Sequence, residues 1–459
     1  MPSRDDIVAL DKSFVWHPYT AMDIYVRDVD PFVIERASGP FLFDVDGRRY
    51  IDANASWWVS ALGHNHPRLV AALKSQAEAL CHCSLAGTIH PQAAQLASEL
   101  VAVAPTGLSR VFFSDDGSTA VESAIKMAVQ LFAQSERGRA KNRFVALEGA
   151  FHGETVGASS LGGVEVFRRP FSSVLFDCVR VPSPADPLGW ERAFDAVRAI
   201  VDRSADRIAG VVIEPLVQGA AGMQVYDARF LSELRDLCSR RDVLLIADEV
   251  FTGYGRTGRM WACDHAGITP DILCVGKGFS GGLLPMAATL ATEQVFRGFG
   301  GDRSRALLYG HSYAGNPLGA AVAREVLAIF REQDVVGQAR RKGDQIAAAF
   351  QAIGELAGAS NPRWCGMIGA VDLSIEPAAG NPAAPGDAVE TEEDLSRSGY
   401  LGGAGWLVYE AARRRGAYLR PLGNTVYICP PLNIDDAVLE QLLGIVHESV
   451  AEVLNDGRG

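Results

Sequence analysis

The chain has 459 residues, of which 48% are hydrophobic, 8% aromatic and 21% charged, a balance typical of a globular protein rather than a disordered, fibrous or membrane one. Its formal net charge of -12 disfavours a general attraction to nucleic acid or to anionic membranes. Such a length usually exceeds one compact core, so we expect two domains.

The cysteines and the N-terminal segment indicate a cytoplasmic protein. The eight cysteines are scattered, without the dense pairing of a secreted disulfide scaffold, so we expect reduced thiols. The first residues lack the apolar core of a signal peptide, and no apolar run reaches about 20 residues. We therefore expect a soluble, cytoplasmic protein with no membrane or nucleic-acid partner.

In chain order, the first predicted elements are two short strands within residues 39–52, joined at Asp46-Gly47, a hairpin signal. From about residue 70 to 330, helix-like stretches alternate with short apolar runs, which is typical of βαβ units. These runs show little polar alternation, as expected for parallel strands covered on both faces. The predicted strands are 110–114, 144–147, 210–213, 243–247 and 272–275.

The C-terminal part differs from this middle region. Residues 417–429 predict two strands around Gly423-Asn424, followed by a helix from Asp435 to about Asn455. Residues 376–405 are rich in alanine, glycine, proline and acidic residues, which predicts an exposed loop. We therefore expect an α/β protein with a large domain at 71–330 and a smaller α+β domain built from residues 1–70 and 331–459.

Chemistry is expected directly after the predicted strands, because ligands of such sheets gather at the carboxyl ends of the strands. The strand 243–247 leads into two carboxylates, Asp248 and Glu249, and the strand 272–275 leads into Lys277 between two glycines. A lysine in a dry, uncrowded setting has a lowered pKa and can attack a carbonyl carbon. An acid beside it is suited to hold the protonated ring nitrogen of a pyridine-type cofactor. The acidic pair is equally consistent with a helix cap or a solvated strand end.

An anion site is predicted after the strand 110–114. The backbone N–H groups of Gly117 and Ser118 lie at the expected start of a helix, where the helix dipole favours a phosphate. The same Gly-Ser pair is also consistent with an ordinary N-cap. The group Cys81-His82-Cys83 with His90 lacks a second paired cluster, so we expect no metal site.

Together, Asp248, the run Gly255-Arg-Thr-Gly258 and Lys277 resemble the signature of the class III aminotransferases of fold type I, and the resemblance extends over nearly the whole chain. It implies a fold type I transferase dependent on pyridoxal 5'-phosphate, with a mostly parallel central sheet. It also implies a two-step, ping-pong reaction on small-molecule substrates and a homodimer with active sites at the subunit interface.

Three further motifs resemble one branch of that family. They are Trp16-His-Pro-Tyr-Thr20, Ser56-Trp57-Trp58 and Arg420-Pro-Leu. The branch transfers an amino group from S-adenosylmethionine to 8-amino-7-oxononanoate, giving 7,8-diaminononanoate for biotin synthesis. The alternative within the family is a broad ω-transaminase acting on amines or amino acids with pyruvate-type acceptors. A nicotinamide-dependent oxidoreductase is disfavoured, because no Gly-x-Gly-x-x-Gly follows the first strand of the middle region.

The resemblance implies a role for each matching residue. Lys277 would be the catalytic residue and hold the cofactor covalently, while Asp248 would pair with the ring nitrogen. Gly117 and Ser118 would bind the phosphate, and Phe151 would stack on the ring where a tyrosine is usual. We expect His152 to pack or to orient a strand end, and Trp58 to be structural.

The remaining predicted site residues bind substrate or come from the second subunit. His311, where a proline is more usual, and Ser312 would lie at the phosphate of the other subunit's cofactor. Arg420 would bind the carboxylate of the oxononanoate, for which a planar guanidinium is the natural partner. The complete predicted substrate set is Tyr19, Trp57, Glu154, Arg256, Gly310 and Arg420.

Overall fold

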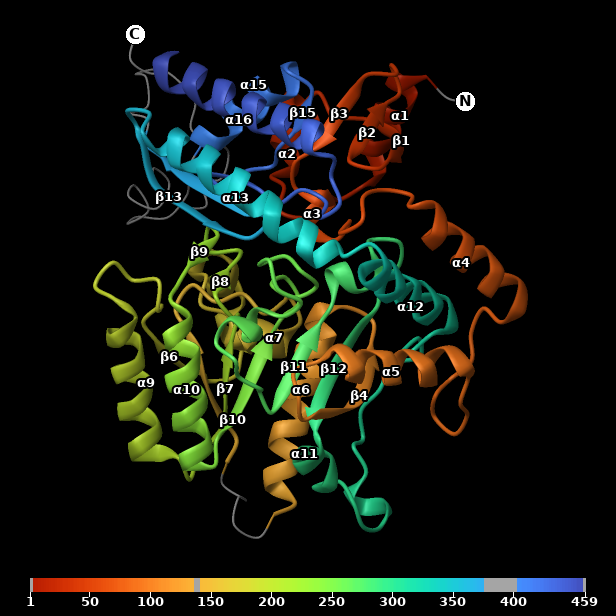
Figure 1. Ribbon diagram of the computed structural model, residues 1–459, viewed down its shortest axis with the longest axis vertical. Helices are drawn as coiled ribbons and strands as arrows, with labels where there is room; N and C mark the ends of the chain where they lie inside the picture. The colour runs from red at the N-terminus through yellow and green to blue at the C-terminus, as the bar shows by residue number, and fades with distance from the viewer. Residues whose placement is uncertain (1–2, 136–140, 375–402, 457–459) are drawn as a thin grey trace.

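A computed structural model describes residues 3–135, 141–374 and 403–456 of the chain (Figure 1). Its centre is a seven-stranded sheet with the strand order β4-β12-β11-β10-β7-β5-β6. All neighbouring strands are parallel except those that pair with β12. The strands are β4 (Leu108–Ser114), β5 (Arg143–Leu147), β6 (Val179–Val181), β7 (Ile208–Ile213), β10 (Leu244–Asp248), β11 (Ile272–Val275) and β12 (Ala287–Thr292).

The central strands are buried on both faces, which explains their continuous apolar sequences. Every residue of β7, β10 and β11 is buried. Helices cover the sheet: α9 and α10 lie along one side in Figure 1, and α4, α5 and α12 lie toward the other. The predicted α/β fold class and all five predicted central strands are confirmed. The helices around this sheet are α4 (Pro67–Ala79), α5 (Pro91–Val103), α6 (Gly117–Ala133), α7 (Val156–Leu161), α8 (Glu165–Arg168), α9 (Trp190–Ser204), α10 (Ala228–Arg241), α11 (Glu293–Arg297) and α12 (Pro317–Glu332).

The two ends of the chain share one four-stranded sheet, β1-β2-β3-β15. Its N-terminal strands are β1 (Ile34–Ser38), β2 (Phe41–Asp44) and β3 (Arg49–Asp52), and β15 (Ala417–Tyr418) pairs parallel with β3. The antiparallel β2–β3 hairpin confirms the prediction for residues 39–52. In Figure 1 the red N-terminal and blue C-terminal segments accordingly lie together at the top. The helices of these segments are α1 (Arg4–Phe14), α2 (Met22–Asp28), α15 (Ala404–Arg414) and α16 (Asp436–Asp456).

Residues 417–429 form the two predicted strands around Gly423-Asn424, but these strands do not pair with each other. A tight turn does form at Gly423-Asn424, where Leu422 and Thr425 exchange backbone hydrogen bonds of 3.0 Å. The strands on either side of it belong to different sheets, however, because β15 pairs with β3 and β16 (Thr425–Ile428) pairs with β14. The main chain that leaves β15 is bound elsewhere: the N–H of Arg420 donates to Asn54 Oδ1 at 2.6 Å.

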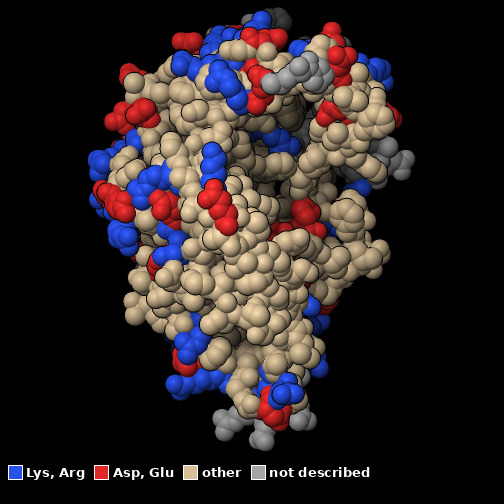
Figure 2. Space-filling model, turned by 90° about the vertical axis from the view of Figure 1, so that its right-hand side faces the viewer, with Lys and Arg blue, Asp and Glu red and all other residues tan. Residues whose placement is uncertain are grey.

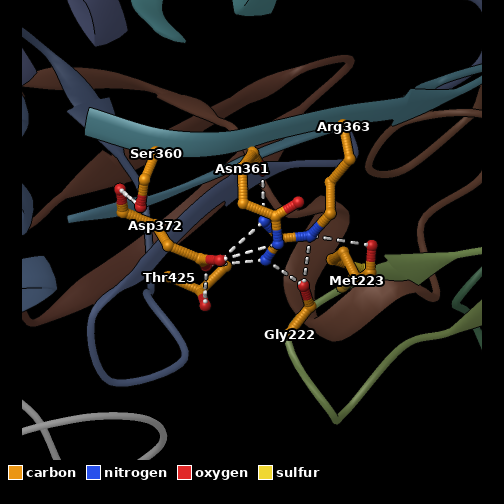
Figure 3. A network of polar contacts seen from close by, with 7 residues as sticks. All are labelled: Gly222, Met223, Ser360, Asn361, Arg363, Asp372 and Thr425. Atoms are coloured by element: carbon orange, nitrogen blue, oxygen red, sulfur yellow. Dashed lines mark hydrogen bonds and ion pairs between the residues drawn. The ribbon is translucent and has the colours of Figure 1, made fainter. Parts of the chain in front are cut away.

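A third sheet, β13-β14-β16, connects the C-terminal segment to the central part of the molecule. Its other strands are β13 (Ala359–Cys365) and β14 (Ile368–Leu373), and the long helix α13 (Val335–Gly354) packs on them. Arg363 of β13 donates to the main-chain oxygen of Met223 at 3.2 Å and pairs with Asp372 Oδ1 at 2.7 Å (Figure 3). Arg363 therefore joins this sheet to the loop between the short strands β8 (Val217–Gln218) and β9 (Gln224–Val225).

Most of the predicted loop at 376–405 lies outside the described residues. Its last three residues are described, and α15 begins among them at Ala404. Among the described residues, no helix is long and apolar enough to cross a membrane. The domain bounds at residues 70 and 330 stay a prediction.

Candidate active site

A cavity of about 410 Å³ lies where β10 and β11 end and α6 begins. Five predicted site residues line it together: Gly117, Ser118, Phe151, Asp248 and Lys277. Six further lining residues bring aromatic or ionisable side chains: Trp58, Asp115, Asp116, His152, Glu214 and Phe251. On the face shown in Figure 2 the surface is hollowed between the upper and lower parts of the molecule, with basic and acidic side chains at the hollow.

Lys277 follows β11 in a left-handed conformation, with a φ of 45°. Its Nζ lies 5.0 Å from the centre of the Trp58 ring. Burial lowers the pKa of Lys277, although the negative charges of Asp248 and Glu214 act in the opposite direction. A larger share of this amine is therefore neutral near pH 7 than for a lysine in water, and a neutral amine can act as a nucleophile or accept a proton.

Asp248 ends β10 and is only 5% exposed. Its Oδ2 lies 2.8 Å from Nδ1 of His152, and its Oδ1 accepts the N–H of Val250 at 3.1 Å. Burial acts to lower the pKa of His152, but the hydrogen bond to Asp248 and the charges of Asp248 and Glu214 outweigh it and raise that pKa. The pair thus holds a carboxylate at the cavity wall with an imidazole behind it.

Glu214 lies directly after β7 and is 4% exposed. Its carboxylate accepts the N–H of Phe151 at 2.9 Å and the N–H of Gly219 at 3.0 Å. Burial raises the pKa of Glu214 to about 7, against the opposing influence of His152. Glu214 therefore fixes the main chain that carries Phe151 and His152 into the cavity.

The first turn of α6 offers an anion site. The helix begins at Gly117 and is capped by Asp116, whose side chain accepts the N–H of Thr119. A side chain at Gly117 would come within 2.6 Å of Val250 Cγ1, so the close approach of Val250 requires glycine here. Ser118 Oγ accepts the N–H of Glu154 at 3.1 Å. Free N–H groups and the helix dipole suit a phosphate here.

A left-handed turn at residues 55–58 places Trp58 in the cavity lining and Trp57 outside it. Ala55, Ser56, Trp57 and Trp58 have φ angles of 45°, 46°, 67° and 74°. This conformation costs a residue other than glycine roughly 1–2 kcal/mol. Trp58 is 6% exposed and lines the cavity, whereas Trp57 is 41% exposed. Trp58 thus lies inside the site, and its neighbour Trp57 lies on the outside.

Four predicted substrate residues meet beside the cavity. The hydroxyl of Tyr19 donates a hydrogen bond to the carboxylate of Glu154. The Tyr19 ring lies 5.6 Å from that of Trp57, and the Arg420 guanidinium lies 4.6 Å from the centre of the Trp57 ring. This arrangement combines an apolar wall with one positive and one negative group.

The other predicted site residues lie outside the cavity lining of the single chain. Arg256 is 3% exposed and donates to the main-chain oxygen of Pro430 at 2.7 Å, and burial lowers its pKa. His311 Nδ1 lies 2.8 Å from Asp115 Oδ2, while Gly310 and Ser312 are exposed. Their predicted roles stay predictions.

The comparisons with known proteins identify the family. The family model described as aminotransferase class-III matches residues 24–450. The chain belongs to the class-III aminotransferases. The resemblance inferred from its motifs is therefore confirmed.

Relatives and solved structures match this aminotransferase over nearly its whole length. A Geobacter sulfurreducens protein named adenosylmethionine-8-amino-7-oxononanoate aminotransferase is 38% identical over 96% of this chain and 97% of its own. A Synechococcus elongatus protein of the same name is also 38% identical, over 96% and 99%. The structure of the enzyme of that name from Methanocaldococcus jannaschii has a TM-score of 0.89 at 33% identity, with 98% and 99% covered. An amine transaminase from an uncultivated Pseudomonas species, in a PLP-bound form, has a TM-score of 0.86 at 30% identity, with 95% and 98% covered.

The motifs of the aminotransferase did not place Trp58 or Glu214 in its cavity. His152, which we expected to pack or orient a strand end, lies 2.8 Å from the carboxylate at the end of β10, in agreement with that expectation. Trp58, expected to be structural, lies over Lys277. Glu214 had no predicted role, although an acidic residue directly after a buried strand is the same signal that singled out Asp248.

Glu249 of the aminotransferase turns away from the cavity lining. Its carboxylate accepts the N–H groups of Ala262 and Cys263, both at 2.8 Å. Burial raises the pKa of Glu249 from 4.5 to about 7, although these two hydrogen bonds act to lower it.

The raised pKa of Glu249 predicts a pH-dependent contribution to stability. Because the folded state holds this proton more tightly, the contribution is fully present below the unfolded pKa of 4.5 and is lost as the pH rises to about 7. As the pH rises from 4.5 to about 7, the free energy of unfolding of Glu249→Gln should therefore increase by about 3 kcal/mol relative to that of the native protein. Urea denaturation of both proteins from pH 4.5 to 8 measures this change. A difference between them that does not vary with pH would contradict the interpretation.

Proposed function

We propose that the aminotransferase transfers an amino group from S-adenosylmethionine to 8-amino-7-oxononanoate, forming 7,8-diaminononanoate for biotin synthesis, with pyridoxal 5'-phosphate as cofactor. The observation that carries the proposal is the cavity that joins Lys277, Asp248 and the first turn of α6. The relatives of this name, which match the chain over nearly its whole length, support the choice of substrates.

The residues of the cavity fit pyridoxal phosphate. Gly117 begins α6, and the first backbone N–H groups of a helix have no partner within the helix and suit a phosphate. The buried carboxylate of Asp248 suits a protonated ring nitrogen, and the amine of Lys277 suits an aldehyde carbon. When bound, this cofactor withdraws electrons from the substrate carbon that loses a proton.

Each polar residue then has a task that follows from its setting. Lys277 would hold the cofactor covalently and, once displaced by the amino substrate, would accept and return a proton at Nζ, which its lowered pKa favours. Asp248 would keep its negative charge toward the ring nitrogen, with His152 2.8 Å behind it. Trp58 and Phe251, whose rings are 4.4 Å apart, would exclude water from one side of the cavity.

The residues at the side of the cavity support the proposed acceptor. Arg420 is suited to bind the carboxylate of 8-amino-7-oxononanoate, and the Tyr19 and Trp57 rings are suited to its alkyl chain. The ring of Phe151 can stack but has no hydroxyl to donate to a substrate. The carboxylate of Glu154, held by Tyr19, would attract the positively charged donor.

A homodimer with shared sites is part of the proposal. The view in Figure 2 has a broad surface with few charged side chains below the hollow. Large apolar side chains are strongly exposed on the single chain, including Trp16 at 87%, Ile89 at 89% and Leu308 at 83%. Such exposure is unusual for a surface that stays in water. We infer that Gly310, His311 and Ser312 reach the site of the second subunit.

The eight free cysteines support a cytoplasmic location.

Product formation from two substrate pairs tests the proposed function. The purified protein with pyridoxal phosphate is expected to form 7,8-diaminononanoate from S-adenosylmethionine and 8-amino-7-oxononanoate, detected by mass spectrometry. Simple amines with pyruvate are the second pair. Turnover with that pair alone would contradict the biotin-pathway assignment and would favour an ω-transaminase.

A further inference from the structure

The left-handed turn at residues 55–58 is held by a buried carboxylate. Asp52, the last residue of β3, is completely buried. Its Oδ2 accepts the hydroxyl of Ser56 at 2.8 Å and lies 2.8 Å from Nε2 of His64. Its Oδ1 accepts the N–H of Asn54 at 3.2 Å. Both oxygens of one carboxylate thus bind groups within or next to the turn.

The opposite side of this carboxylate is fixed by the main chain of His64. The N–H of His64 donates to the oxygen of Gly39 at 2.7 Å, and the N–H of Gly39 donates back at 2.9 Å. The approach requires glycine at position 63, because a side chain there would meet the Gly39 carbonyl carbon at 2.8 Å. His64 is therefore held by Gly39, which lies between β1 and β2, and its position does not depend on the turn at residues 55–58.

Four consecutive residues other than glycine in the left-handed region are strained, and such backbone persists only where the surroundings enforce it. The strained turn affects the cavity because it orients the adjacent side chains of Trp57 and Trp58 toward different contacts. Trp58 donates Nε1–H to the Tyr427 hydroxyl at 3.0 Å and lies over Lys277, while Trp57 lies against Arg420. A relaxed turn would move both rings.

We propose that Asp52, clamped between Ser56 and His64, is a positioning residue for amino-group transfer that holds the left-handed turn carrying Trp57 and Trp58. The inference rests on the aminotransferase chemistry at Lys277, which Asp52 does not touch. Asp52 acts on substrate through the two tryptophans, so its loss affects the binding of the acceptor more than the proton transfer at Lys277.

The test uses Asp52→Asn, with Asp44→Asn as the matched control. Asp44 is a buried carboxylate of the same sheet that binds Tyr50 and the turn at Arg48, with no bond to residues 55–58. We expect Asp52→Asn to lower kcat/KM for 8-amino-7-oxononanoate by about 100-fold, mainly through a higher KM. Near-ultraviolet circular dichroism without substrate should change as well, because Trp58 shifts against Phe251. Asp44→Asn should change neither.

A second substitution distinguishes positioning from a general loss of structure. Glycine adopts positive φ angles without strain, so Ala55→Gly added to Asp52→Asn should restore kcat/KM about tenfold. If Asp52→Asn does not fold, Ser56→Ala carries the test, with a loss of about tenfold that Ala55→Gly reverses. Kinetic constants and dichroism equal to those of the native protein, or a fall in kcat with KM unchanged, would overturn the proposal. The dichroism needs no substrate, so it tests the clamp even if the proposed transfer is not observed.

Discussion

Lys277→Ala is expected to abolish amino-group transfer, with kcat reduced by about 10,000-fold or more. In the proposed mechanism, the substitution removes both the attachment point for the cofactor and the amine that would accept and return the proton. The lowered pKa of Lys277 makes this double role possible, because burial disfavours the charged amine. Single-turnover measurements with an excess of each substrate, at saturating pyridoxal phosphate, determine the remaining rate.

An exposed lysine provides the control for this prediction. Lys74 lies on α4, is exposed, and is absent from the cavity lining, so Lys74→Ala should leave kcat unchanged. An added small primary amine should restore part of the rate of Lys277→Ala, because alanine leaves space beside Trp58. A Lys277→Ala protein that turns over within tenfold of the native rate would show that another residue moves the proton.

Asp248→Asn is expected to reduce kcat/KM by about 1,000-fold. Asparagine keeps the size of the side chain but removes the negative charge that would stabilise a protonated ring nitrogen. The pKa of His152 should then fall, because its hydrogen bond to Asp248 and the charge of that carboxylate raise it. Steady-state kinetics measure the fall in kcat/KM, and nuclear magnetic resonance of the His152 imidazole as a function of pH measures the fall in its pKa.

The neighbouring carboxylate makes a matched control for the loss at Asp248. Glu249 is also buried, but it binds the main chain at Ala262 and Cys263 instead of lining the cavity. Glu249→Gln should therefore leave kcat close to native. Equal loss of activity in Asp248→Asn and Glu249→Gln would show that either change acts by disturbing the end of β10, and that the charge of Asp248 is not decisive.

Much of the fold could be predicted because buried strands leave a clear mark on a sequence. The run Ile272–Val275 is continuous and apolar and forms β11 within the predicted bounds. The hairpin at Asp46-Gly47 was predictable because its turn and its strand pairing are both local. Residues 417–429 carry a similar turn signal, but the pairing of β15 with β3 depends on residues more than 300 positions away, which a local pattern does not contain.

The sequence predicts those site residues that belong to motifs. It does not predict those whose role depends on the three-dimensional geometry of the chain. Lys277 and Asp248 follow strands that lie side by side in the sheet, so the strand ends bring them together. The left-handed turn at 55–58 contains no glycine, and nothing in its sequence indicates positive φ angles. The clamp that enforces it depends on Asp52, Ser56 and His64, and their contacts appear only in the folded chain.

The attachment site of the cofactor tests the central claim most directly. The native protein would be incubated with pyridoxal phosphate, reduced with borohydride, digested and mapped by mass spectrometry. We predict a single modified peptide, with the reduced cofactor on Nζ of Lys277 and none bound to Lys277→Ala. An unmodified Lys277, or a stoichiometric adduct on another lysine, would contradict the account.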